Sequence, residues 1–184
     1  MPTWVALLRG INVGKHKRIA MADLRALVEE LGGTDVRTYV TSGNVVFASD
    51  VTDPARLEDV IADAIRASLG QDVPVVVRTA AEMAQIVAGN PFPEATADPK
   101  TLHVAFLART PDPDAVARLA EVEKGEDDYR VVGKNVYLFY PNRLTGAVFM
   151  PNGLDAALGM VTTSRNWQTV VKLAEMAGTS GGSR

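Results

Sequence analysis

Residues 36–48, VRTYVTSGNVVFA, form the stretch that sets the fold. Two runs rich in β-branched and aromatic residues, 36–41 and 44–48, flank Ser42-Gly43, and a connection this short predicts a β-hairpin. A hairpin makes its two strands neighbours in an antiparallel pair. The segments that precede and follow it along the chain therefore determine the topology.

Before the hairpin, the pattern predicts one strand and one helix. Residues 3–8, TWVALL, are a nearly continuous apolar run, which indicates a strand covered on at least one face. From Met21 to Leu31 apolar residues recur at helical spacing, and Gly32-Gly33 supplies a stop.

After the hairpin, the pattern predicts a second helix and a fourth strand. Asp53-Pro54 combines an N-cap residue with a proline at the first helical position, and apolar residues continue at helical spacing to Leu69. Residues 73–78 read as a strand, and Pro74 favours an edge position because proline cannot donate to a strand ladder. Strand, helix, hairpin, helix, strand is the βαββαβ order of a ferredoxin-like unit.

The same order recurs in the second half of the chain. A helix at 80–88 and a proline-rich linker at 90–99 lead to a strand, a helix opened by Asp112-Pro113, and a hairpin at 128–140. Residues 144–159 show no regular pattern, and a last helix is expected at 164–176. We therefore predict an α+β fold of two ferredoxin-like halves arisen by internal duplication. The expected boundaries are 1–79 for the first half, 80–100 for the helix and linker, 101–177 for the second half, and 178–184 for a mobile tail.

The composition excludes several classes of protein. With 47% hydrophobic and 22% charged residues, the 184-residue chain has ordinary globular composition. The absence of cysteine excludes disulfides and thiolate metal sites and fits a reducing compartment, so we expect a cytoplasmic protein. No signal peptide or membrane-spanning stretch is expected, and two isolated histidines predict no metal site.

The loop at 9–18, RGINVGKHKR, stands out by its charge. It carries four cations and no acid, whereas the chain after residue 20 carries 15 of the 19 Lys and Arg and all 22 Asp and Glu. A cationic loop on an acidic body is typical of an anion site, although a solvated loop tip would have the same charge. The spacing does not fit a nucleotide-triphosphate loop, because only three residues separate the glycines and a histidine follows the lysine. The residues expected to bind an anion are Arg9, Gly10, Asn12, Gly14, Lys15 and Arg18.

Two further polar stretches are candidates for the same site. Thr163 or Ser164 is expected to cap the last helix, which would place Arg165 and Asn166 in its first turn. An arginine there opposes the helix dipole, so either a bound anion or a carboxylate elsewhere in the fold would explain it. At the hairpin tip, Ser42 and Asn44 offer a hydroxyl and an amide, although a tight turn requires such residues anyway.

These stretches resemble a known family. LLRGINVG at 7–14, RTYVTSGNVVF at 37–47 and TSRNW at 163–167 look like the bacterial proteins catalogued as domain of unknown function 1697. The resemblance extends over almost the whole chain. It implies an α+β fold of two related halves and no established activity.

Three functions remain open, in this order. The first is binding of a small phosphate- or carboxylate-bearing ligand by the residues named above, with or without a reaction. The second is nucleic-acid binding through exposed aromatic residues of a sheet, which the acidic net charge of −3 disfavours. The third is an interaction module without a ligand. The sequence indicates no nucleophile, no Ser-His-Asp arrangement, no cofactor and no oligomeric state.

Overall fold

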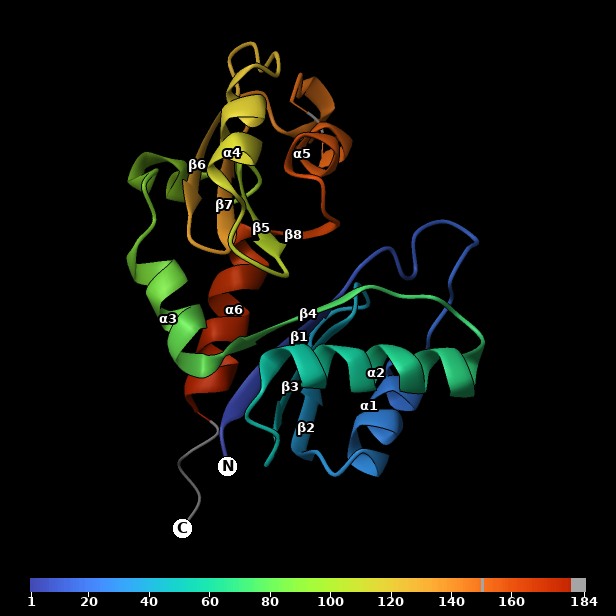
Figure 1. Cartoon of the computed structure of the whole chain (residues 1–184). Helices are drawn as coiled ribbons and strands as arrows, with labels where there is room; N and C mark the ends of the chain where they lie inside the picture. Colours follow the sequence, from blue (N-terminus) through green and yellow to red (C-terminus); the bar gives the residue numbers. More distant parts are fainter. Residues whose placement is uncertain (150, 180–184) are drawn as a thin grey trace. The chain divides into compact units, whose positions relative to one another are not determined.

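The computed structural model describes residues 1–149 and 151–179 and divides into two compact units. Unit 1 comprises Met1–Val87 together with the chain from Lys172 onward, and unit 2 comprises Ala88–Val171. In the described residues the architecture is mixed α+β, with two four-stranded antiparallel sheets and six α-helices (Figure 1). Each unit contains one sheet. None of these helices is long and apolar enough to cross a membrane.

Unit 1 is built on the first sheet. Its strands lie in the order β2-β3-β1-β4, and every neighbouring pair is antiparallel. The edge position predicted for the strand after Pro74 is therefore confirmed. The elements are β1 (Thr3–Leu8), α1 (Met21–Glu30), β2 (Thr34–Thr38), β3 (Asn44–Ala48), α2 (Pro54–Leu69), β4 (Val75–Thr79) and α3 (Ala80–Ala88).

The core of unit 1 lies between this sheet and the helices α1 and α2. Successive strand residues point to opposite faces, so Trp4, Ala6 and Leu8 of β1 reach the same core cluster. On α2, Leu57, Ile61 and Ile65 recur every four residues and form the buried stripe that packs against it. Helix α2 begins as predicted, because the Asp53 carboxylate accepts a hydrogen bond from the Ala55 amide at 3.1 Å.

Unit 2 has the same strand order, β6-β7-β5-β8, again with antiparallel neighbours. Its core contains residues of α4 and α5 packed with alternate residues of β5 and β7. The elements are the 3-10 helix η1 (Pro93–Ala97), β5 (Leu102–Leu107), α4 (Pro113–Ala120), β6 (Asp128–Val132), β7 (Asn135–Phe139), the 3-10 helix η2 (Leu144–Gly146), α5 (Pro151–Leu158) and β8 (Thr162–Asn166). Helix α6 (Trp167–Gly178) follows, and its residues from Lys172 onward belong to unit 1.

The sequence prediction for the end of the chain is wrong in two places. The last helix does not begin at Ser164, because residues 162–166 form β8, which pairs with β5. Asn166 caps α6 instead, accepting a hydrogen bond from the Thr169 amide at 2.9 Å. The segment expected to be irregular contains α5. The predicted tail at 178–184 lies outside the described residues, apart from Gly178 and Thr179.

The predicted hairpin between β2 and β3 is confirmed, but its first strand ends at Thr38 and not at Thr41. Gly43 sits in the connection with φ +88°, and its carbonyl accepts a hydrogen bond from the Leu8 amide at 2.8 Å. A Cβ atom at this position would lie 2.7 Å from Leu8 Cβ and 2.8 Å from Ile11 Cδ1. The hairpin therefore packs on β1 through a position that only glycine fits.

We expect Gly43→Ala to lower the free energy of unfolding by about 2–4 kcal/mol, since it combines a left-handed backbone with overpacking. Gly70→Ala is the matched control. Gly70 has φ +65° and no atom within 4 Å of an added Cβ. The substitution Gly70→Ala should therefore lower the free energy of unfolding by only about 1 kcal/mol. Urea unfolding of both variants measures the difference, and equal losses would show that the close packing contributes nothing.

Candidate functional site

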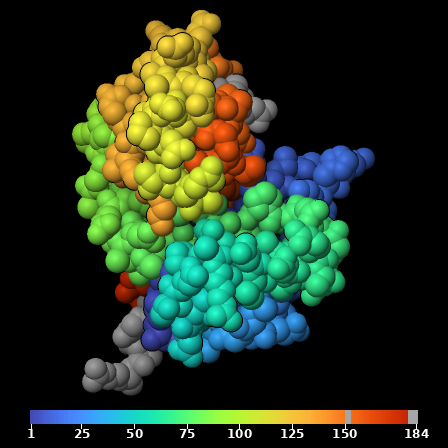
Figure 2. Space-filling view, viewed as in Figure 1, coloured from blue at the N-terminus to red at the C-terminus, as the bar shows by residue number. Residues whose placement is uncertain are grey.

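The loop between β1 and α1, residues 9–20, projects from the surface as a small closed turn. Val13 and His16 form an isolated β-bridge, and the backbone N–H of Asn12 donates to the Lys17 carbonyl at 3.0 Å. Gly14 turns the chain at φ +62°, a conformation that suits glycine. Residues 13–18 are all exposed, and Figure 2 shows part of this N-terminal segment standing out from the surface.

The base of the loop is fixed by the segment that precedes β4. The Lys17 ammonium donates to the Asp72 carbonyl at 2.6 Å, and the Gln71 side chain donates to the Arg18 carbonyl at 3.0 Å. The Arg9 amide donates to the Pro74 carbonyl at 3.0 Å. These bonds hold the loop at both of its ends, so it is an ordered feature of unit 1.

Asn12 joins three segments of unit 1 through its side-chain amide. Its Nδ2 donates to the Ile19 carbonyl at 2.9 Å and to the Thr41 carbonyl at 2.7 Å. Its Oδ1 accepts from the Ile19 amide at 2.9 Å. Both Nδ2 hydrogens are thereby used, so Asn12 positions the loop and the hairpin and has no donor left for a ligand.

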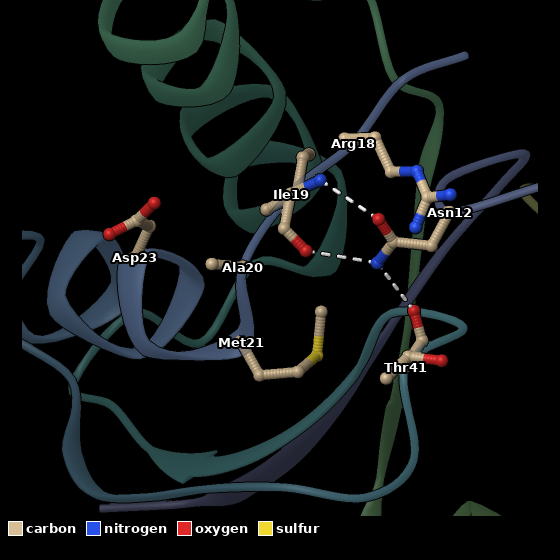
Figure 3. Close-up of a pocket in the computed structure, with 7 residues that line it drawn as sticks. All are labelled: Asn12, Arg18, Ile19, Ala20, Met21, Asp23 and Thr41. Carbon is tan, nitrogen blue, oxygen red and sulfur yellow. Dashed lines mark hydrogen bonds between the residues drawn. The ribbon is translucent and has the colours of Figure 1, made fainter. Parts of the chain in front are cut away.

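A cavity of about 550 Å³ opens where these segments meet the start of α1 (Figure 3). It combines residues from the loop, from the first turn of α1 and from the β2–β3 connection, which are far apart along the chain. The residues that line it are Asn12, Arg18, Ile19, Ala20, Met21, Asp23 and Thr41.

Two groups beside the cavity can attract an anion. The guanidinium of Arg18 is exposed and makes no hydrogen bond or ion pair with any residue that the structure describes. Ala20 occupies the N-cap of α1 and has no capping side chain, so the amides of residues 21–23 have no acceptor in the described part of the chain. Asp23 opposes both groups, because its carboxylate lies in the same first turn.

Of the ten predicted site residues, Asn12 and Arg18 line this cavity. Gly10, Gly14 and Lys15 are exposed elsewhere on the loop, and Arg9 is half-buried at its start. The hairpin contributes Thr41, which was not predicted. Asn44 is fully buried and donates from Nδ2 to the Tyr39 carbonyl and to Ser42 Oγ, both at 2.9 Å, so it stabilises the turn from inside.

Arg165 and Asn166 belong to unit 2, and their predicted setting is corrected by the fold. Arg165 lies in β8 and not in a helical turn, so the dipole argument for an anion beside it does not apply. Its guanidinium is buried, and burial lowers its pKa to about 10, which leaves it charged at neutral pH. It donates to the Ser164 carbonyl at 2.9 Å. That all three motifs share one cavity stays a prediction.

A second buried arginine, Arg78, was not among the residues predicted from the sequence. It is the fourth residue of β4 and pairs with Val5, as Arg165 is the fourth residue of β8 and pairs with Val104. Like Arg165 it donates to the carbonyl of the preceding residue, here Val77 at 2.8 Å. Burial lowers the pKa of Arg78, which Glu82 and then Glu58 partly offset.

Unit 2 also contains a buried histidine. His103 packs edge-on against the ring of Tyr140, with ring centroids 5.5 Å apart. In the described residues neither His103 Nδ1 nor the Tyr140 hydroxyl has a hydrogen-bond partner. Burial lowers the pKa of His103 to about 4 and, together with the nearby Asp127 carboxylate, raises that of Tyr140. The sequence analysis counted His103 only as one of two isolated histidines and did not predict its burial.

Comparison with known proteins places the chain in a family. The family model described as protein of unknown function (DUF1697) matches residues 1–137. The chain belongs to the DUF1697 family. No curated protein matches it significantly. A solved structure titled as that of the conserved bacterial protein SP0830 from Streptococcus pneumoniae is 20% identical, with a TM-score of 0.73. The match covers 96% of this chain and 98% of the other, and it shows a shared fold.

His103 should make this DUF1697 protein acid-sensitive. The folded pKa of about 4 lies below the unfolded value of 6.5, so the unfolded chain binds the proton more readily and stability falls as pH drops below about 6.5. We expect the free energy of unfolding to fall by about 2 kcal/mol between pH 7.5 and pH 5. Urea unfolding at both pH values measures it. His103→Gln should abolish the loss and His16→Gln, at the exposed histidine, should keep it; an unchanged loss in His103→Gln would contradict the assignment.

Proposed function

We propose that unit 1 binds a small anionic ligand, bearing phosphate or carboxylate, in the cavity at the start of α1. The observation that carries this proposal is the unpaired guanidinium of Arg18 beside uncapped first-turn amides on one cavity. A helix N-terminus offers N–H donors and a partial positive charge to an anion. An arginine adds a charge-assisted and often bidentate hydrogen bond.

In this proposal the other unit 1 residues of the predicted site have supporting roles. Asn12 holds the cavity open between loop and hairpin, and Asn44 with Ser42 holds the hairpin that presents Thr41. Gly10 and Gly14 allow the left-handed turns of the loop, at φ +69° and +62°. The remaining loop cations, Arg9 and Lys15, raise the local concentration of anions around the cavity.

Comparison of the two units supports a special role for the loop. The connection from β5 to α4 at the corresponding place in unit 2 spans only residues 108–112, whereas the connection from β1 to α1 spans 9–20. A long connection without secondary structure in a compact unit is usually functional. The extra length in unit 1 contains the four cations of the loop.

We infer that the two units descend from one ferredoxin-like unit by duplication. Both have the βαββαβ order and the same strand order. Arg78 and Arg165 occupy the same register position, and each is followed by a residue that caps the next helix. Thr79 Oγ1 accepts from the Glu82 amide at 3.1 Å, and Asn166 Oδ1 accepts from the Thr169 amide at 2.9 Å.

The alternative of nucleic-acid binding through a sheet finds less support. None of the aromatic residues on or beside the strands is fully exposed. Tyr39, Tyr129 and Phe139 are half-buried, and the buried ones are Trp4, Phe47, Phe106, Tyr137 and Tyr140. Base stacking requires exposed rings on the strands. An interaction module without a ligand would give the cavity at the start of α1 no role. For a chain without cysteine we propose a cytoplasmic location.

Calorimetric titration with inorganic phosphate at low ionic strength tests the proposal. Arg18→Gln should weaken phosphate binding about tenfold or more, because it removes a charge-assisted hydrogen bond. Arg109→Gln is the control, since Arg109 is an exposed cation on the shorter connection of unit 2 and loses the same charge. Equal affinities in both variants, or no binding by the wild-type protein, would refute the proposal.

A further inference from the structure

The cavity at the start of α1 is lined by two opposite charges that do not pair with each other. Arg18 and Asp23 both line it, and neither side chain makes a hydrogen bond or ion pair with any residue in the described ranges. In the view of Figure 3 they lie on opposite sides of Ala20. From this arrangement we propose that the ligand is amphoteric: its anionic group binds Arg18 and its ammonium group binds Asp23. This inference rests on the proposed anion site.

Asp23 weakens the binding of a simple anion relative to that of an anion that also carries an ammonium group. Two like charges a few ångströms apart near a protein surface repel each other. A ligand that also carries an ammonium group replaces this repulsion with a charge-assisted hydrogen bond. The presence of Asp23 therefore selects among anions and does not exclude them.

The wall between the two charges is apolar. Four residues separate Arg18 from Asp23 along the chain, and three of them, Ile19, Ala20 and Met21, line the same cavity. Met21 is half-buried, and a methionine side chain adapts to the shape of what it contacts. A short carbon spacer between the anionic group and the ammonium group fits this wall. The ligand class is thus an aminoalkyl phosphate or a short amino acid.

A simpler role for Asp23 is to stabilise the N-terminus of α1. An acid in the first turn stabilises the helix through its dipole, whether or not a ligand binds. This role would make Asp23→Asn slightly less stable, but it would not change the order of preference among anions. Ligand preference, and not stability, therefore separates the two roles.

The test is calorimetric titration with phosphoethanolamine and with ethyl phosphate, which differ by the ammonium group. The wild-type protein should bind phosphoethanolamine about five- to tenfold more tightly. Asp23→Asn should abolish this preference by weakening phosphoethanolamine while ethyl phosphate binds as before or better. Asp59→Asn, at an exposed acid of α2, should keep the preference.

Each outcome decides the question. If ethyl phosphate binds and the preference survives in Asp23→Asn, or never existed, the amphoteric ligand is wrong while the anion site stands. If both compounds weaken equally in Asp23→Asn, Asp23 acts only on the structure of α1 and the inference is wrong. If neither compound binds the wild-type protein, the anion site itself fails and the inference falls with it.

Discussion

The side-chain amide of Asn12 is the constraint on which the candidate site depends. It ties the loop after β1 to Ile19, two residues before α1, and to Thr41 in the β2–β3 connection, through hydrogen bonds of 2.7–2.9 Å. Asn12 itself has φ +54°, a backbone conformation that asparagine tolerates better than most residues. An amide is needed because only it offers two donors and an acceptor from one short side chain.

The two units share one strand order but differ in a buried side chain and in the connection after the first strand. Trp4 and His103 occupy the same position, opposite Thr79 and Asn166 on the neighbouring edge strand. Unit 1 fills this position with an indole and has a long basic loop after its first strand. Unit 2 has a short connection there and buries an imidazole. The candidate ligand site therefore belongs to what unit 1 adds and not to what the units share.

Local patterns were sufficient to predict the strands of unit 1, the hairpin, and the start of α2 at Asp53-Pro54. These features depend on residues that are adjacent along the chain. The start of α6 was not predictable in this way, because residues 162–166 form a strand by pairing with distant β5. The burial of Arg78 and Arg165 likewise depends on tertiary packing. The cavity was not predicted from the sequence, because Thr41 lies in a different segment of the chain from Arg18 and Asp23.

The most direct measurement of the central claim is a titration of isotope-labelled protein with inorganic phosphate, followed by the NMR shifts of the backbone amides. The account predicts saturable shifts that are largest at Ala22 and Asp23 in the first turn of α1 and are accompanied by a shift of the Arg18 side chain. Shifts spread over exposed lysines and arginines of both units without saturation, or none at α1, would contradict it.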